Sequence, residues 1–150
     1  RASWLEEHGV TANFVQDNES KSDKNVLRGL HLQAPPYGQA KLLRVVNGAI
    51  FDVAVDLRRN SPTYGQYFGL ELNEENKTML YIPEGFAHGF CCLKDDTIVQ
   101  YKCSNYYNKA SEIGVIWNDP SININWPTND PLISEKDLIL PTLDKFSSPF

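Results

Sequence analysis

The sequence predicts a mainly β protein that folds as a sandwich or barrel, with short helical pieces only near the termini. Short apolar or aromatic runs recur along the chain, turn residues lie between them, and helical periodicity is scarce. Hydrophobic residues make up 41% of the 150 residues. This length and composition suit one domain that spans residues 1–150 and contains a hydrophobic core.

The expected elements follow from these patterns in chain order. Ser3–His8 predicts one or two helical turns, which Gly9 ends. The runs that predict strands are Leu27–Gln33, Lys41–Val46, Ala49–Asp56, Tyr64–Leu72, Thr78–Ile82, Gly89–Leu93 and Thr97–Cys103. Pro, Asn and Asp predominate from Asn118 on, which indicates ordered loop with one short helix near Ser134–Asp137.

Asn47-Gly48 joins two of these runs and predicts a tight hairpin, because both central residues of a type I′ turn adopt positive φ. In that register Leu43 opposes Asp52, and side-chain alternation puts Lys41 and Asp52 on one mostly apolar face. Two interpretations of these charges stay open. They form an ion pair on a solvated face, or they belong to a site inside a barrel.

Charge and composition argue against several classes of protein. The net charge of −5 disfavours nucleic-acid binding, which needs a basic patch. No apolar run approaches the about 20 residues of a membrane helix, and no signal-peptide pattern is present. The three cysteines, an odd number without a CxxC motif, make a poor disulfide framework, so a cytoplasmic location is expected.

Two histidines lie in strand-like segments beside glycines, His31 in Arg28–Gln33 and His88 in Pro83–Phe90. Histidine is the only side chain that titrates near neutrality without perturbation, so these two are the candidate proton carriers. The third, His8, lies in a short amphipathic stretch that is typical of a surface.

A metal site at these histidines is not expected. Pro83-x-Gly85-x-x-His88 is similar to the second motif of the cupin superfamily, whose metal-binding members use His-x-His in the first motif. Here Gln33 stands in the place of that second imidazole. His31 and His88 alone are too few ligands for a tight transition-metal site.

General acid–base chemistry fits the residues best. No Gly-x-Ser-x-Gly and no glycine-rich phosphate loop is present, which argues against nucleophilic catalysis and nucleotide hydrolysis. A His31 base and a Tyr101 acid on different strands of a barrel could address opposite faces of one substrate. A tyrosine considered alone is more often a core residue, so the case for Tyr101 depends on its neighbours.

A series of short segments identifies a family through its order and number. The segments are Phe14–Asn18, Ser20–Ser22, Asn25–His31, Lys41-Leu42, Phe51–Asp56, Ser61–Gly65, Ile82–Phe90, Tyr101-Lys102, Tyr106-Tyr107, Trp117–Asp119 and Leu132–Asp137. Together they resemble the dTDP-4-dehydrorhamnose 3,5-epimerase family over nearly the whole chain. The resemblance implies a cupin-like jelly roll or β-barrel, no metal or other cofactor, and a homodimer.

The resemblance also implies roles for individual residues. His31 matches the base of the family's His–Asp dyad, and Asp137 matches its partner. Tyr101 matches the general acid, and Lys41 matches the lysine near the ketone oxygen. Five residues of this chain match residues that surround the sugar nucleotide in the family's pocket. They are Gln16, Asn18, Arg28, His88 and Tyr106, with Tyr107 as the alternative to Tyr106.

The implied reaction is epimerisation of dTDP-4-dehydro-6-deoxy-D-glucose at C3 and C5 to dTDP-4-dehydro-L-rhamnose, in dTDP-L-rhamnose biosynthesis. The C4 ketone acidifies the C–H bonds at C3 and C5, so proton transfer suffices and no redox cofactor is needed. The alternatives are an epimerase of C3 or C5 alone, a non-catalytic sugar-nucleotide-binding cupin and a metal-dependent cupin oxygenase.

The resemblance raises two expectations about assembly. Family members have further N-terminal strands with an Arg-Gly-Phe-Phe segment that helps form the dimer, and Arg1-Ala2-Ser3 does not supply it. The aromatic run Tyr64–Leu72, with its spaced glycines, is a candidate edge strand that could pair across a two-fold axis.

Overall fold

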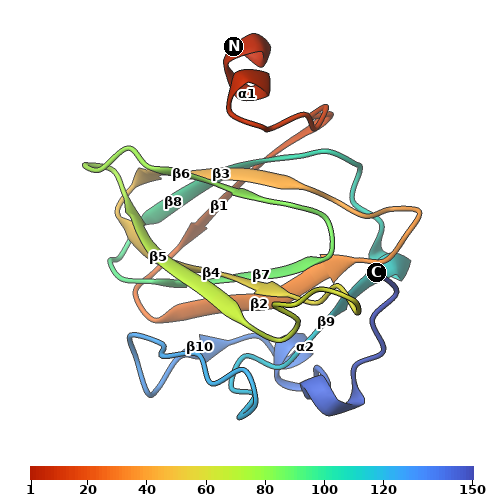
Figure 1. The fold of residues 1–150 in the computed structure, drawn as a ribbon. Helices are drawn as coiled ribbons and strands as arrows, with labels where there is room; N and C mark the ends of the chain where they lie inside the picture. The colour runs from red at the N-terminus through yellow and green to blue at the C-terminus, as the bar shows by residue number, and fades with distance from the viewer.

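Two β-sheets packed face to face make up the body of the protein, as Figure 1 shows in a computed structural model that describes residues 1–150. The expected mainly β, cupin-like fold is confirmed. The strands are β1 (Gln16–Ser22), β2 (Val26–Gln33), β3 (Lys41–Asn47), β4 (Ala49–Asp56), β5 (Tyr67–Asn73), β6 (Met79–Ile82), β7 (Phe86–Cys92), β8 (Thr97–Cys103), β9 (Glu112–Gly114) and β10 (Leu132–Ile133).

Short helical pieces flank the sheets near both ends of the chain, as the sequence predicts. They are α1 (Ala2–Glu7), η1 (Lys109–Ser111), α2 (Glu135–Leu138) and η2 (Leu143–Lys145). Helix α1 stands away from the sheets (Figure 1), and none of its residues is buried. No helix has the length and apolar character that crossing a membrane would require.

Strands that are distant in sequence pair with one another in both sheets. The first sheet has the order β1-β8-β3-β6, and the second has the order β10-β2-β7-β4-β5, with β9 also pairing with β2. All pairings are antiparallel except that of β10 with β2. The polypeptide therefore passes repeatedly from one sheet to the other, as in a jelly roll.

The prediction of a hairpin at Asn47-Gly48 is wrong. Strand β3 pairs with β6 and β8, whereas β4 pairs with β5 and β7. Only Gly48 has positive φ, at +82°, so the pair does not form a type I′ turn. The chain turns a corner between the sheets here, and a Cβ at Gly48 would overlap the Thr97 side chain.

The predicted strand Tyr64–Leu72 begins too early, because Tyr64 and Gly65 form a turn and β5 starts only at Tyr67. Gly65 adopts a φ of +77°, which favours glycine and ends the extended run. Strand β5 lies at one end of the second sheet, so its predicted edge position is observed.

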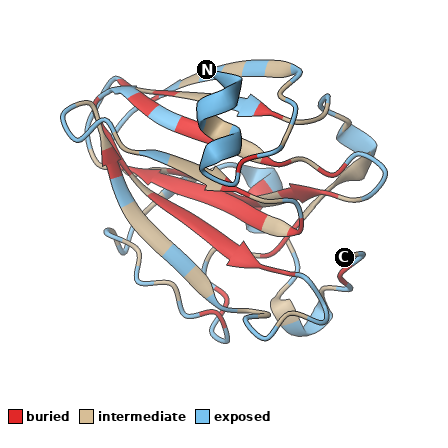
Figure 2. Cartoon of the chain, turned by 45° about the horizontal axis from the view of Figure 1, so that its top comes forward, coloured by how far each residue is buried: buried red, intermediate tan, exposed pale blue.

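Two apolar clusters make up the core. The first fills the space between the sheets and includes Leu43, Ile50 and Phe90. The second packs the outer face of the second sheet against the C-terminal segment and includes Leu30, Val53 and Val115. Figure 2 shows the resulting concentration of buried residues in the central strands.

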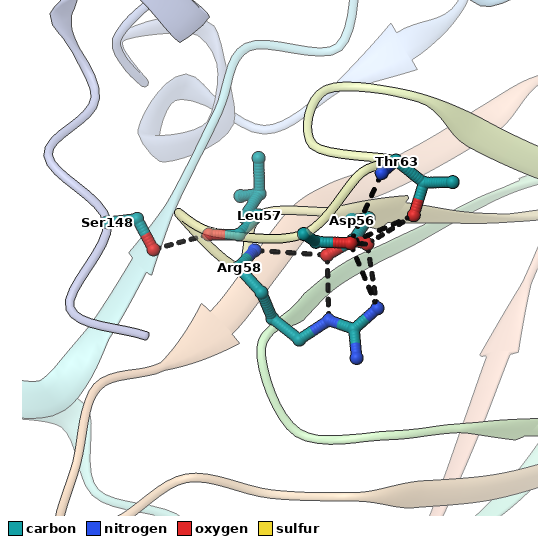
Figure 3. Close-up of polar contacts among 6 residues, drawn as sticks. Asp56, Leu57, Arg58, Thr63 and Ser148 are labelled. Carbon is teal, nitrogen blue, oxygen red and sulfur yellow. Dashed lines mark hydrogen bonds and ion pairs between the residues drawn. The ribbon is translucent and has the colours of Figure 1, made fainter.

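Asp56, at the end of β4, organises the following loop and the C-terminal tail (Figure 3). Its carboxylate accepts hydrogen bonds from the guanidinium of Arg58 at 2.8 and 2.9 Å, and from the hydroxyls of Ser61 at 2.5 Å and Thr63 at 2.6 Å. Ser148 donates to the backbone oxygen of neighbouring Leu57. Burial opposes the ionised form of Asp56, but these hydrogen bonds outweigh it and lower the pKa of Asp56 well below its usual range.

Asp56→Asn should therefore destabilise the fold by about 2 kcal/mol at pH 7, the scale of hydrogen bonds to a charged group. Because the folded-state pKa of Asp56 is lowered, its contribution is complete above the unfolded-state pKa and is lost as pH falls toward the folded-state value. Urea unfolding of wild type and variant between pH 7 and pH 2 measures this difference. Equal free energies of unfolding at pH 7 would contradict the assignment.

Candidate active site

A cavity of about 560 Å³ lies between the two sheets and is lined from both walls. The second sheet contributes Arg28, His31, Gln33 and His88, and the first contributes Gln16, Asn18, Lys41, Tyr101 and Cys103. Glu112, Lys136 and Asp137 close it from the later part of the chain. A cavity of this size and mixed polarity is typical of a small-molecule site.

Strand β2 departs from regular alternation where it meets the cavity. Arg28 and His31 both line the cavity, although residues three apart face opposite sides of a regular strand. The register of β2 against β7 shifts between these two residues, and Gly29 adopts a φ of +113°. A Cβ at Gly29 would lie 2.6 Å from Gly89 Cα, so only glycine allows this close approach of the strands.

His31 is held by Asp137, whose side chain is buried on helix α2. The two side chains meet through His31 Nε2 and Asp137 Oδ1 at 2.7 Å, and the Gly29 amide donates to the other carboxylate oxygen at 3.2 Å. Burial opposes the ionised form of Asp137, but the hydrogen bond and charge of His31 outweigh it and lower the pKa of Asp137. The ionised carboxylate therefore accepts the Nε2 hydrogen and leaves Nδ1 of a neutral His31 available as a base.

Glu112 is a second carboxylate near His31, and the sequence analysis missed it. Its Oε1 lies 3.8 Å from His31 Nε2, and it accepts hydrogen bonds from Tyr107 Oη at 2.6 Å and Lys136 Nζ at 2.9 Å. Burial opposes its ionisation, but these contacts lower the pKa of Glu112. Glu112 reaches the cavity because the short strand β9 pairs with β2 beside His31, and so short a strand leaves no pattern in the sequence.

Tyr101 faces the cavity from the opposite wall, on β8. Its cross-strand neighbours are Asn18 on β1 and Leu43 on β3, and its ring also packs against the core between the sheets. Burial, with a further contribution from Cys103, raises the pKa of Tyr101, so the phenol keeps its proton at neutral pH. Tyr101 therefore packs against the core and also lines the cavity, and its role as an acid stays a prediction.

Lys41 and Asp52 lie inside the barrel, which decides between the two interpretations of these charges. Asp52 is fully buried, and its Oδ1 lies 2.7 Å from His88 Nε2. Lys41 lines the cavity and makes no ion-pair contact with Asp52. Burial lowers the pKa of Lys41, and the charges of Cys103, Asp52 and Glu112 oppose that shift.

The choice of Tyr106 over Tyr107 as a pocket residue is wrong in this structure. Tyr107 lines the cavity, whereas Tyr106 does not and is 65% exposed. The Tyr107 amide donates to Gln16 Oε1 at 3.0 Å, while the Tyr106 carbonyl accepts from Gln33 at 3.2 Å. These backbone contacts fix which ring faces inward, and they depend on tertiary structure that the Tyr-Tyr pair does not reveal.

The two cavity histidines are themselves cross-strand partners, His31 on β2 opposite His88 on β7. Each has Nε2 bonded to a carboxylate, and no group of three His, Cys, Asp or Glu side chains is arranged to hold a metal ion. The walls thus present a carboxylate-bound imidazole on one side and a protonated phenol on the other. Such an arrangement can move protons on both faces of a bound substrate.

Comparisons with known proteins identify the family that this chain resembles. The family model for dTDP-4-dehydrorhamnose 3,5-epimerase matches residues 1–145. An enzyme of that name from Shigella flexneri is 57% identical over 130 residues, which are 87% of this chain and 72% of the relative.

Two crystal structures superpose closely on the fold. The dTDP-4-dehydrorhamnose 3,5-epimerase of Bacillus anthracis, with TDP and PPi bound, has a TM-score of 0.93 at 49% identity and covers 95% of this chain and 82% of its own. The Legionella pneumophila dTDP-6-deoxy-D-glucose-3,5-epimerase, in complex with dTDP-4-keto-L-rhamnose, has a TM-score of 0.94 at 45% identity, with coverages of 98% and 79%. The chain therefore belongs to the dTDP-4-dehydrorhamnose 3,5-epimerase family.

Proposed function

We propose that this protein epimerises dTDP-4-dehydro-6-deoxy-D-glucose at C3 and C5 to dTDP-4-dehydro-L-rhamnose, as a step in dTDP-L-rhamnose biosynthesis. One observation carries the proposal. The His31–Asp137 pair and Tyr101 line the same cavity from facing walls, as inversion at carbon requires. The relatives described above, one with TDP and one with a dTDP-4-keto sugar bound, support this substrate class.

His31 is the general base in this mechanism. The C4 ketone acidifies the adjacent C–H bonds, and Nδ1 of His31 takes the proton from C3 or C5. Asp137, which is ionised and hydrogen-bonded to Nε2, holds the ring in this tautomer and stabilises the imidazolium that forms. A positioned base of this kind is worth about 10²–10⁴ in rate.

The enolate that follows carries negative charge on the C4 oxygen. Lys41 faces the cavity from the first sheet and is the donor that we assign to this oxygen, with Arg28 nearby on β2. His88 faces the cavity from the other wall, but its Nε2 is bonded to Asp52, so it can donate to this oxygen only as an imidazolium. Donors placed before the reaction stabilise the developing charge most when water is excluded. Neither the removal of the proton nor its return is a redox step, so the reaction requires no metal or redox cofactor.

Tyr101 returns a proton to the opposite face of the enolate and thereby inverts the carbon. Its phenol is protonated at neutral pH, which is the form that an acid needs. Gln16, Asn18 and Tyr107 lie at the same cavity, and we assign them to the nucleotide sugar.

We also propose a cytoplasmic location, because all three cysteines are free thiols and the cytosol keeps thiols reduced.

Incubation of the 4-keto sugar with the protein in D₂O tests the reaction. Wild type should incorporate one deuterium at C3 and one at C5, with inversion at both carbons, as NMR would show. His31→Ala should reduce exchange at both carbons by about 10²-fold or more, since both protons depend on one base. His8→Ala removes the exposed third histidine, whose ring stacks on Trp4 outside the cavity, and should retain full activity.

The pattern of deuterium also separates the alternative functions. Label at a single carbon would assign the chain to the C3-only or C5-only epimerases. Tight binding of the dTDP sugar without any label would assign it to non-catalytic binding proteins and would contradict the proposal.

Tyr101→Phe separates the acid from the base. Phenylalanine retains the ring that packs against the core, so the fold should persist. His31 can still remove protons and return them to the same face, so deuterium wash-in should continue while inversion falls by about 10²-fold or more. Near-complete inversion by the variant would assign the acid role to another group.

We also propose that the protein forms a homodimer through the edge of the second sheet. Strand β5 ends that sheet and carries Phe68, which is 55% exposed on an edge open to further pairing. Light scattering at micromolar concentration should give twice the 17.0 kDa chain mass, and Phe68→Glu should shift the mass toward the monomer. A monomeric wild type would contradict the proposal.

A further inference from the structure

The segment Asn105–Asn108 connects β8 to η1 beside the cavity and has no regular secondary structure. The N–H and C=O groups of Asn105, Tyr106 and Tyr107 make no hydrogen bond to other backbone groups. Backbone groups need hydrogen-bond partners, and in this segment side chains provide them. These side chains therefore determine where the segment lies.

Gln33 of β2 holds the segment on both sides of Tyr107. Its Nε2 donates to the Tyr106 carbonyl at 3.2 Å and to the Tyr37 carbonyl at 2.7 Å, and its Oε1 accepts from the Asn108 amide at 2.7 Å. The orientation of this buried carboxamide is fixed, because a backbone N–H can only donate and a carbonyl can only accept. Both N–H groups of Gln33 are thus bonded to backbone rather than directed toward a ligand.

These hydrogen bonds determine which of two adjacent tyrosines faces the cavity. Gln33 bonds the peptide groups before and after Tyr107, and Gln16 accepts from the Tyr107 amide at 3.0 Å. Asn108 is extended, with φ −128° and ψ 106°, and successive side chains of extended backbone point to opposite sides. The Tyr107 ring therefore lines the cavity, whereas Tyr106 points away from it and is exposed.

The same pair of strands holds the far end of the Tyr107 side chain. Gln33 on β2 and Glu112 on β9 are directly opposite one another, and Glu112 Oε2 accepts from Tyr107 Oη at 2.6 Å. Gln33 thus fixes the backbone of Tyr107 and Glu112 fixes its hydroxyl. His31 precedes Gln33 by two residues on β2 and lines the same cavity, so one strand sets the place of the ring relative to the base.

We propose that Gln33 is a positioning residue that sets the Tyr107 ring relative to His31 and acts on the substrate only through Tyr107. This inference rests on the proposed function, in which Tyr107 contacts the nucleotide sugar. Tyr107 is exposed at the outer part of the cavity, whereas His31, Lys41 and Tyr101 are partly buried. The ring therefore meets the nucleotide half of the substrate, which extends outward from the reacting sugar.

A role through Tyr107 predicts losses of dTDP binding that do not add. Tyr107→Ala removes the ring and should weaken binding by about tenfold or more, the scale of one lost aromatic contact. Gln33→Met removes the carboxamide at similar length and volume, and should weaken binding by a comparable factor. In the double variant the loss should equal that of Tyr107→Ala alone, because the ring that Gln33 positions is already absent.

Titration calorimetry with dTDP measures this cycle in wild type, both single variants and the double variant. Gln100→Met is the matched control, because it removes a carboxamide that bonds Glu19 and Arg44 on the outer face of the first sheet and should leave the Kd unchanged. Additive losses in the double variant would overturn the inference. So would an unchanged Kd in a folded Gln33→Met or Tyr107→Ala protein.

A milder variant keeps the inference testable if Gln33→Met does not fold, since methionine leaves three backbone groups without their partner. Gln33→Asn keeps a carboxamide but is one methylene too short to reach both the Tyr106 carbonyl and the Asn108 amide. It should show the same loss of dTDP binding and the same cycle with Tyr107→Ala. Wild-type affinity in folded Gln33→Asn would contradict the positioning role.

Kinetics with the 4-keto sugar separate this inference from the proposed function. Gln33→Met should raise KM by the factor measured for dTDP and leave kcat near the wild-type value, because the lost contact serves the ground state and the transition state equally. A lower kcat at unchanged KM would overturn the inference. If the wild type epimerises the sugar but the binding losses add, the inference fails and the function stands. If the losses do not add but the wild type leaves the sugar unchanged, the function fails and the positioning role stands.

Discussion

The site depends on the face-to-face packing of two sheets, because alternation gives each strand a single row of inward-facing side chains. Each row contributes apolar side chains to the core at one end and cavity-lining side chains at the other end. In β3 the row runs from Val45 and Leu43 in the core to Lys41 at the cavity. In β8 it runs from Val99 through Tyr101 to Cys103. The apolar packing that stabilises the fold therefore also sets the separation and orientation of the reactive groups.

Charged groups on these inner rows remain there because other elements provide partners. His31 pairs with Asp137 from helix α2, more than a hundred residues away, and His88 pairs with Asp52 from β4. The two pairs lie side by side because their histidines are opposite one another on β2 and β7. They differ in exposure, since the His31 side chain is 21% exposed and that of His88 is 8% exposed. The more open pair suits a base that meets substrate, and the more enclosed pair suits a side chain that is held in place.

Much of the fold and of the site could be predicted from local patterns and family motifs. The run Thr97–Cys103 is β8 as the sequence predicts, and every predicted strand has a counterpart. The prediction of a hairpin at Asn47-Gly48 failed because the tertiary packing of the sheets, rather than the turn residues, determines whether two consecutive strands pair. Lys41 and Asp52 both lie between the sheets, but they come from the two facing sheets and not from the single face that the hairpin register predicts. The sequence analysis missed Glu112 because a strand of three residues is too short to show an alternation of apolar and polar residues.

A crystal structure of this protein with a dTDP-6-deoxyhexose that lacks the 4-keto group would test the central claim most directly. The central claim is that the two walls of the cavity address opposite faces of one sugar ring. His31 Nδ1 and Tyr101 Oη should then lie on opposite faces of the ring, each about 3–3.5 Å from the carbon that it serves or from that carbon's hydrogen. A sugar bound outside the cavity, or with both groups on one face, would contradict it.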